Sequence, residues 1–476
     1  MRSLDGSNSA RRNRVGLGDA IMLGLSSSGP AQTMAVSLAG LVAVSAYGGV
    51  IPILLCFLPM LGIAIAYQRL NRWDPSSGAT YTWVARVFHP YLGFLAGWMI
   101  LLYYTLGTTT LTIPAGIYSL DLLAPSLIDN HAAIFIAGAF WNALITVLAV
   151  LGLKLVARFE WLTVLFQYSV LLFVAAVAGR ALLHGTTSVA FSWSWFSWSG
   201  LGGMRGLMGG ILIACFMYSG WDAAIYVNEE TTDKANNPGR AALASVVMLA
   251  VVYSLVTFAF QGVLSAGDVQ AHAGNVLSAV SERLLGKPWD AVMSLVVLTG
   301  TLATLQAAVV SAARVGLAMS RDRVMPAFFQ RLSAGGSPWA ATLTMSALNL
   351  ALLALALGTS SIAAALSNAA SSLGLISLVF YGLTAAAALW QQRHTLLASG
   401  ADLVFGGCLP LMGVAFSAFV VIESVSTGAV TATVMLYGLG SILAGAAVAL
   451  FLHRCMHIDF FDSLTSPRPT ALKDGP

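Results

Sequence analysis

Two long apolar segments of this chain are interrupted near their middles by residues that do not sustain a helix. Residues 24–30 read Gly-Leu-Ser-Ser-Ser-Gly-Pro, and residues 218–222 read Tyr-Ser-Gly-Trp-Asp. Inside a bilayer, non-helical backbone is tolerated only where it is buried in protein or lines a water-filled cavity. Two such breaks at corresponding places in the halves of a chain therefore predict a solute-binding site between them.

The composition places the chain in a membrane. Hydrophobic residues make up 58% of the 476 residues, charged residues make up 9%, and the mean hydropathy is +0.82. Soluble domains contain about 25% charged residues, so a polytopic α-helical membrane protein is expected. Twelve bilayer-spanning helices are predicted, at approximately 17–42, 47–69, 92–118, 132–152, 158–182, 205–228, 239–263, 289–319, 339–358, 362–391, 403–424 and 429–452.

The basic residues predict the orientation. If the N-terminus is cytoplasmic, the cytoplasmic loops and tails hold every Lys and Arg except Arg180, Arg205, Arg283 and Lys287. The positive-inside rule predicts such a bias, and an error of one span would abolish it. The expected location is therefore the cytoplasmic membrane of the cell, with several passes and with both termini cytoplasmic.

The predicted spans divide into two sets of five, each of which begins with a broken helix, and a remaining pair. Because five is odd, the second set must lie upside down relative to the first, which is an inverted repeat. The expected fold is all-α, with a five-plus-five inverted repeat, helices 1 and 6 broken, and helices 11 and 12 added. The expected parts are an N-terminal tail at 1–15, repeats at 16–183 and 204–392, a helix pair at 402–453 and a C-terminal tail at 454–476.

The breaks carry groups that suit an amino acid. Free N–H groups at the start of a half-helix attract a carboxylate, and free C=O groups at the end of a half-helix accept from an ammonium. Glycine permits close approach, and proline fits the first position of the second half-helix. An alternative is a kink in which the serine hydroxyls bond back to the preceding turn. The predicted substrate-binding residues are Ser26, Ser27, Ser28, Gly29, Phe216, Ser219, Gly220 and Trp221.

Asp222 is the one acid expected well inside a span, whereas Glu160 is expected near a segment end. A carboxylate at such depth is costly and marks function by default. Asp222 would accept a coupling proton, hold the amine of a cationic substrate, or pair with a donor and stabilise the bend. The sequence leaves these three roles open.

Other functional classes lack their motifs. The chain has no phosphate-binding loop, no nucleophile motif and no Cys/His metal array, so neither an enzyme nor an ATP-driven pump is expected. No cofactor, metal site or nucleic-acid partner is predicted. The four cysteines show no pairing pattern and are expected to be free thiols: Cys56, Cys215, Cys408 and Cys455. The expected partners are the lipid bilayer, a small amino acid or amine and a coupling ion, with the protein a monomer or homodimer.

Residues 15–460 resemble the amino acid–polyamine–organocation superfamily of permeases. The resemblance rests on the first break and on the stretches at 75–86, 93–98, 218–231 and 311–326. It implies a leucine-transporter-type fold. It also implies that backbone at Ser26, Ser27, Ser28 and Gly29 holds the substrate carboxylate. Backbone at Phe216, Ser219 and Gly220 would hold the amine, and the Phe216 ring would close over the substrate.

The resemblance also bears on ion coupling. Some proton-coupled members carry a lysine in the fifth helix, at the place that Gln167 occupies here, and glutamine does not titrate. The expected function is a secondary active transporter for an amino acid or related organic amine. It would work by alternating access and be proton-coupled, with Asp222 and Gln167 as the candidate coupling residues. The alternatives are an exchanger or sodium-coupled carrier for amino acids or polyamines and, in a different class, a membrane amino acid sensor that transports nothing.

Overall fold

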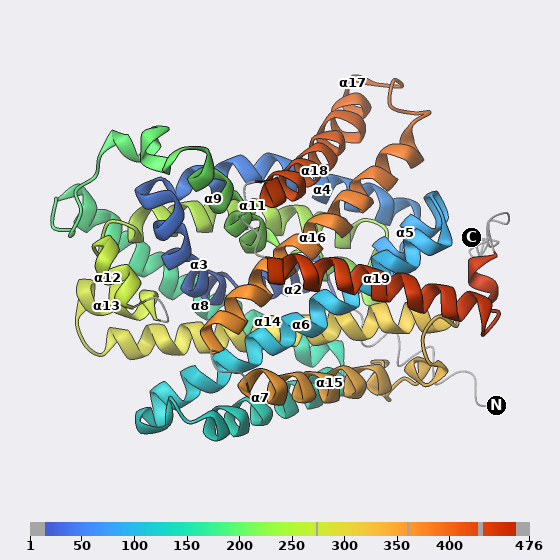
Figure 1. Cartoon of the computed structure of the whole chain (residues 1–476), viewed down its shortest axis with the longest axis horizontal. Coiled ribbons are helices and arrows are strands. Elements are labelled where there is room, and N and C mark those ends of the chain that lie inside the picture. Colours follow the sequence, from blue (N-terminus) through green and yellow to red (C-terminus); the bar gives the residue numbers. More distant parts are fainter. Residues whose placement is uncertain (1–14, 273–274, 359–361, 427–431, 463–476) are drawn as a thin grey trace.

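The computed structural model describes residues 15–272, 275–358, 362–426 and 432–462. Within these residues the chain is helical, and its one β-type pairing is an isolated bridge between Val15 and Thr231. The helices, shown in Figure 1, are α2 (Leu17–Ser28), α3 (Pro30–Ser45), α4 (Val50–Trp73), α5 (Thr80–Val87), α6 (Pro90–Leu123), α7 (His131–Leu151), α8 (Leu153–Leu183), α9 (Gly203–Tyr218), α10 (Ala223–Tyr226), α11 (Asn237–Phe260), α12 (Ala266–Ala271), α13 (Val276–Leu285), α14 (Trp289–Arg321), α15 (Trp339–Leu357), α16 (Ile362–Gln392), α17 (Gly400–Asp402), α18 (Leu409–Ser426) and α19 (Ala432–Arg454).

The predicted membrane-protein class is confirmed. Among the described residues, 11 helices are long and apolar enough to cross a bilayer, counting α2 with α3 and α9 with α10 as one span each. The predicted count of twelve is not confirmed. The predicted twelfth span at 429–452 overlaps α19, whose apolar stretch Gly438–Arg454 is shorter than the others, and also includes residues outside the described part.

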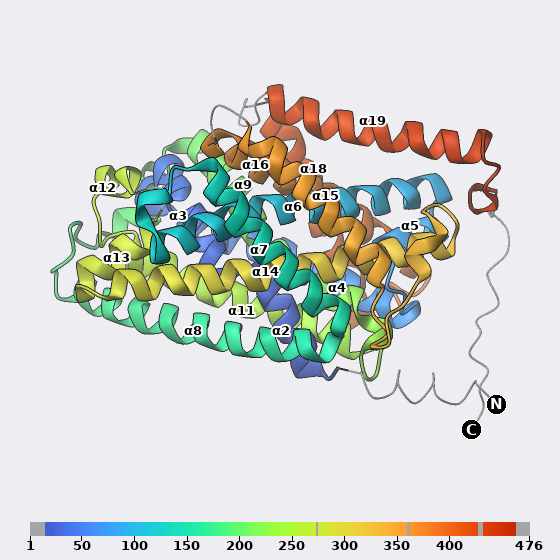
Figure 2. The same cartoon turned by 90° about the horizontal axis from the view of Figure 1, so that it is seen from below.

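The two broken helices lie inside the bundle. The first half-helix, α2, packs against α8, α11 and α14, while α3 packs against α9 and α14. α14 itself is largely buried and makes extensive contact with α6. In Figure 2, α8 lies along one edge of the bundle and α19 along the opposite edge, with α3, α9 and α14 between them.

Two of the connections between spans contain short helices. After the second span the structure has a short helix, α5, whose buried residues include Tyr81 and Trp83. Between α11 and α14 the structure adds α12 and α13, which the sequence did not predict. α13 buries Val276, Leu277 and Val280 on one face, so packing against α14 accounts for this helix.

Candidate functional site

The first break is confirmed but is narrower than predicted. α2 continues through Ser28, and Gly29 alone separates it from α3, which begins at Pro30. Gly29 adopts φ 50° and ψ 66°, and its N–H bonds to the carbonyls of Leu25 and Ser26 at 3.2 and 2.9 Å. This left-handed conformation favours glycine, so it explains how one residue redirects the helix.

The second break is confirmed with the predicted boundaries. α9 ends at Tyr218, and the short helix α10 begins at Ala223. Gly220 has φ 103°, a conformation that is accessible essentially to glycine. The Ser219 hydroxyl donates to the Phe216 carbonyl at 2.6 Å, which satisfies one carbonyl at the end of α9.

The two breaks touch each other. A Cβ atom placed on Gly220 would lie 2.7 Å from the Ser27 carbonyl oxygen and 3.1 Å from the Ser28 nitrogen. A Cβ atom placed on Gly24 would lie 3.1 Å from the Trp221 carbonyl oxygen. Residues about 190 positions apart are therefore in backbone contact, and glycine at both positions makes this contact possible.

Side chains from α14 and α11, together with one from α3 itself, hold the first break. Thr304 of α14 donates to the Ser26 carbonyl at 2.8 Å, and Tyr253 of α11 donates to the Ser28 carbonyl at 3.1 Å. Thr33 also donates to the Ser28 carbonyl, at 2.7 Å. At the second break, Tyr103 of α6 donates to the Ser219 hydroxyl at 2.8 Å. The sequence alone does not predict these contacts, because they depend on how the helices pack.

The serine hydroxyls of the first break follow the alternative that the sequence left open. Ser26 donates to the Leu23 carbonyl at 3.0 Å, and Ser28 donates to the Gly24 carbonyl at 3.2 Å. Bonding to the preceding turn is a common arrangement of serine in membrane helices. In this conformation the break therefore presents its backbone rather than the hydroxyls of Ser26 and Ser28.

Asp222 is buried and is bonded to two tyrosines. Its carboxylate accepts from Tyr226 and from Tyr381 of α16, both at 2.8 Å. The Tyr381 hydroxyl also accepts from the Gly220 N–H at 3.2 Å. Of the three roles open for Asp222, pairing with donors that stabilise the bend is thus present in this conformation.

Trp221 faces the same aromatic cluster as Asp222. Its ring stacks on Tyr381 with centroids 5.3 Å apart and meets the edge of Tyr67 of α4 at 5.1 Å. The indole nitrogen of Trp221 has no hydrogen-bond partner among the described residues. Phe216 lies on α9 near Gly374 of α16, whose added Cβ would be 3.8 Å from the Phe216 Cβ.

The hydroxyl of Tyr381 connects the second break to α16, so removing it should lower the stability of the protein. Tyr381→Phe would leave the Gly220 N–H and one Asp222 oxygen without a partner. An unsatisfied buried group costs about 1–3 kcal/mol, so we expect a lower unfolding midpoint. Tyr218→Phe is the control: its hydroxyl donates at 3.2 Å to the Ile53 carbonyl, whereas the side-chain hydrogen bonds to Asp222 come from Tyr226 and Tyr381. Equal effects of the two substitutions on the unfolding midpoint would contradict a specific role for Tyr381.

Gln167 lies on α8 and is fully buried beside α14. A Cβ atom placed on Gly300 would lie 2.8 Å from the Gln167 Oε1 and 3.4 Å from the Ala31 Cβ. Neither polar atom of its amide has a hydrogen-bond partner among the described residues. Gln167 therefore lies where the first broken helix meets α14. Asp222, in contrast, is bonded to Tyr381 of α16.

The prediction that Glu160 lies near a segment end is wrong. α8 begins at Leu153, so Glu160 is two turns inside the helix, and it is 0% exposed. The sequence placed the start at Arg158 because Lys154 and Arg158 are charged. Both are exposed, since they lie on the opposite face of the helix from Glu160.

A polar network joins the segment after the second break to α14. Arg314 donates to both carboxylate oxygens of Glu230, at 2.6 and 3.0 Å, and Arg321 donates to Glu229. Burial works to raise the pKa of Glu229. Arg321 and the donors of Ser77 outweigh burial and hold that pKa below its usual value. Glu229 is therefore ionised at neutral pH, and the connection is held by charge-assisted bonds.

The network extends to the start of the described chain. The Val15 N–H donates to the Glu230 carbonyl at 3.1 Å, and the Thr232 N–H donates to the Val15 carbonyl at 2.9 Å. Asn228 donates to the Asn71 side chain at 2.8 Å and to the Ser76 carbonyl at 2.9 Å. At this end of the bundle, the chain before α2, the α4–α5 connection and the segment after α10 are thus bonded together.

Residues 19–422 match the sequence profile of a family described as amino acid permease. This chain belongs to that family. It is a family of transporters and not of enzymes, and the predicted resemblance is confirmed.

Three curated relatives of the chain are named as carriers of amino acids or of an amine. A low-affinity putrescine importer of Escherichia coli K12 is 26% identical over 57% of this chain and 59% of its own length. A branched-chain amino acid permease of Lactococcus lactis is 23% identical over 75% of this chain and 78% of its own length. A serine/threonine exchanger of Bacillus subtilis is 25% identical over 62% of this chain and 65% of its own length. The match therefore spans less than two thirds of two of these relatives.

Proposed function

We propose that this permease is a secondary active transporter that carries an amino acid or related organic amine across the cytoplasmic membrane by alternating access. The observation that carries the proposal is the contact between the two helix breaks at Ser27 and Gly220 in a chain of the amino acid permease family. Unwound backbone at one place offers both N–H and C=O groups, and an amino acid head carries the complementary carboxylate and ammonium.

The proposed substrate site consists of the residues predicted from sequence. Ser26, Ser27, Ser28 and Gly29 would bind the carboxylate, Phe216, Ser219 and Gly220 would bind the amine, and Phe216 and Trp221 would enclose it. The two breaks fill each other's space here, so substrate entry requires them to separate. Relative motion of two helix sets about such a contact is how alternating access operates in inverted-repeat transporters. We take residues 16–183 and 204–392 as these repeats.

The bonded end of the bundle is the proposed closed cytoplasmic gate. Its Arg314–Glu230 and Arg321–Glu229 pairs join α14 to the segment after the second break. Basic residues gather at this end, so the positive-inside rule puts it in the cytoplasm together with both termini. Opening toward the cytoplasm would require these pairs to separate.

Proton coupling through Asp222 is part of the proposal. Asp222→Asn should lower substrate accumulation under an inward proton gradient by at least about tenfold, because an amide carries no proton and loses one acceptor for Tyr226 or Tyr381. Gln167 does not titrate, so Gln167→Ala should leave the pH dependence in place. Full pH-dependent accumulation by the Asp222→Asn protein would remove Asp222 from the coupling step.

The test of the proposed function is uptake by proteoliposomes that contain the purified protein. Radiolabelled putrescine, leucine and serine are offered under an inward proton gradient, with sodium absent and then present. Accumulation without sodium supports the proton-coupled carrier. Release of preloaded label on addition of external substrate, without net accumulation, supports an exchanger. Accumulation only with sodium supports a sodium-coupled carrier, and binding without any flux would support a sensor and overturn transport.

A further inference from the structure

Glu160 is a buried carboxyl group that the proposed site does not use. It lies in the interior of α8 with no exposed surface. Neither of its oxygens has a hydrogen-bond partner among the described residues, in contrast to Asp222, which receives two phenol hydroxyls. A buried carboxylate without partners is strongly disfavoured, so this environment fits an uncharged, proton-bearing carboxyl.

The same face of α8 carries a second unpartnered group. Gln167 follows Glu160 by seven residues, which is two helical turns, and both are fully buried. Thr163 lies between them on this face and donates to the carbonyls of Phe159 and Glu160. The face is therefore polar where α8 packs against α2 and α14. Polar groups left unsatisfied inside a membrane protein are expensive, and they mark function by default.

Ser26 of the first break lies at the level of Glu160 along the contact of α2 and α8. Leu23 and Ala157 line one cavity at this contact, and Ala31 and Gln167 both lie beside Gly300. Ser26 and Glu160 lie between these two pairs, so the Ser26 hydroxyl belongs to the same contact of α2 and α8. In this conformation that hydroxyl donates to the Leu23 carbonyl, at 3.0 Å. A hydroxyl has one hydrogen to donate. An ionised Glu160 would therefore compete with the Leu23 carbonyl for it, whereas a protonated Glu160 carries its own donor.

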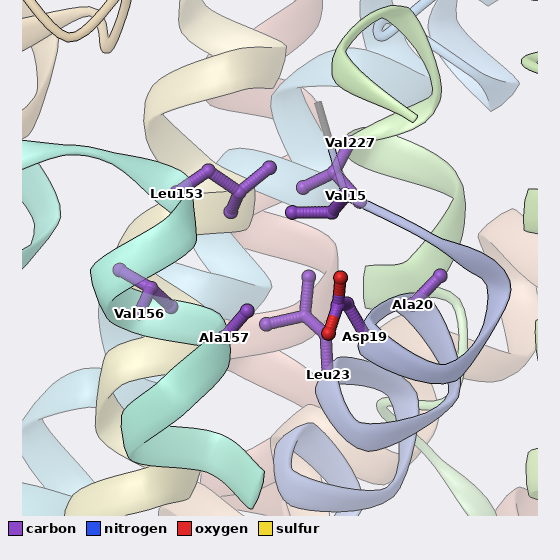
Figure 3. Close-up of a pocket in the computed structure, with 8 residues that line it drawn as sticks. All are labelled: Val15, Asp19, Ala20, Leu23, Leu153, Val156, Ala157 and Val227. Atoms are coloured by element: carbon purple, nitrogen blue, oxygen red, sulfur yellow. The ribbon is translucent and has the colours of Figure 1, made fainter. Parts of the chain in front are cut away.

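A small cavity lies along the same contact. It has a volume of about 10 Å³, and α2 and α8 supply most of its lining, including Leu23 and Ala157. Figure 3 shows the Asp19 side chain between these two helices, among the residues that line the cavity. Leu23 precedes Ser26 by three residues, and Ala157 precedes Glu160 by three residues. Three residues are less than one helical turn. The volume is near the lower limit for one water molecule, so slight widening would bring water close to Glu160.

The other titratable groups around α8 have partners elsewhere or lie on other faces. Asp19 of α2 accepts from the Trp161 indole at 2.9 Å and from the Gly16 N–H at 2.8 Å, and Arg314 of α14 is paired with Glu230. α3 has no titratable side chain. The remaining titratable residues on α8 and the helices packed against it are His131, Lys154, Arg158, Tyr168, Arg180, Arg240, Tyr253, Glu282, Arg283, Asp290 and Arg321. In the described part of the chain, none of these groups forms a hydrogen bond or ion pair with Glu160.

We propose that Glu160 is a proton-binding group for coupling on the side of the first break, and that Ser26 transmits its protonation state to that break. When the contact of α2 and α8 widens, the Glu160 carboxyl gives its proton to water that enters the cavity. The carboxylate then takes the hydrogen bond of the Ser26 hydroxyl away from Leu23. The last turn of α2 loses this tie next to the proposed carboxylate-binding backbone. This inference rests on the proposed proton-coupled transport.

The test uses the full-length protein in proteoliposomes with radiolabelled putrescine, leucine and serine as probes. Counterflow, in which internal and external substrate exchange without a gradient, reports whether the carrier cycles. Accumulation under an inward proton gradient reports coupling. We expect Glu160→Gln to keep counterflow and to lose gradient-driven accumulation by at least about tenfold, since an amide holds no titrating proton. Glu160→Asp should regain part of the accumulation, and Glu282→Gln, at an exposed glutamate of α13, should match the wild type.

A spectroscopic measurement keeps the proposal testable if Glu160→Gln is inactive in both formats. Infrared difference spectra between acidic and alkaline buffer should contain a protonated-carboxyl band in the wild type that Glu160→Gln removes and Glu282→Gln retains. Gradient-driven accumulation at the wild-type level by Glu160→Gln would overturn the proposal, as would identical infrared spectra. If the wild type shows neither counterflow nor accumulation, the proposed transport function fails, and the infrared band still decides whether Glu160 titrates.

Discussion

Gly220→Ala is expected to lower the rate of substrate uptake by at least about tenfold while the protein still inserts in the membrane. Gly220 has φ 103°, which an alanine adopts only under strain, and a Cβ atom would lie 2.7 Å from the Ser27 carbonyl oxygen. Strained backbone of this kind costs about 1–3 kcal/mol, and about 1.4 kcal/mol corresponds to a tenfold change in rate. Because the clash is with backbone, a rotamer change of the neighbour does not relieve it.

The measurement for this substitution is initial uptake into proteoliposomes, normalised to the amount of reconstituted protein. Gly179→Ala is the matched control, because a Cβ atom there meets nothing within 4 Å. Gly179 lies within α8, where alanine is favoured over glycine by about 1 kcal/mol, so this protein should be as stable as the wild type or more so. Wild-type uptake by the Gly220→Ala protein would show that close contact of the two breaks is unnecessary for transport.

Arg314→Ala is expected to destabilise the protein strongly, because it leaves Glu230 without its partner. The Arg314 side chain is 3% exposed and Glu230 is 26% exposed, and two hydrogen bonds join them. Removing one member of a buried ion pair costs about 3–5 kcal/mol, and partial exposure of Glu230 puts the expectation at the lower end. Arg314→Lys should recover only part of this loss, since an ammonium does not reproduce the two-point contact.

The control for Arg314 is Arg321, which lies two turns further along α14. Arg321 pairs with Glu229, but its side chain is 45% exposed, and exposed pairs contribute about 0–1 kcal/mol. Unfolding midpoints in detergent should therefore fall far more for Arg314→Ala than for Arg321→Ala. A double Arg314→Ala, Glu230→Ala protein should be more stable than Arg314→Ala alone, because the unpaired carboxylate is gone. Equal small shifts for both arginine variants would mean that the Arg314 pair does not hold the end of the bundle together.

The two breaks illustrate what local chemistry predicts well. Gly29 followed by Pro30 ends one helix and starts another, and Gly220 permits a backbone conformation closed to other residues. Such conformations depend on the residue itself, so the sequence locates them. The limits of the first break were drawn too wide because serine is compatible with both a helix and an unwound segment. The structure places Ser26, Ser27 and Ser28 in the last turn of α2.

Glu160 illustrates what a hydropathy reading misses. Lys154 and Arg158 made the start of α8 read as a loop, although both project from the exposed face of a helix that begins at Leu153. The burial of Glu160 depends on which face of α8 meets α2, and a window average contains no such information. α12 and α13 were missed for a related reason, because they are short and are stabilised by packing.

The sequence by itself determined the membrane environment, the positions of the apolar spans and the two places where a span is broken. These properties follow from side-chain hydrophobicity and from backbone freedom at single residues. Only the tertiary structure decided that the breaks touch at Ser27 and Gly220, that Tyr381 anchors Asp222, and that Glu160 is buried where α8 meets α2. Each of these contacts joins residues more than 100 positions apart. The packing of whole helices, rather than local preference, sets which of their faces meet.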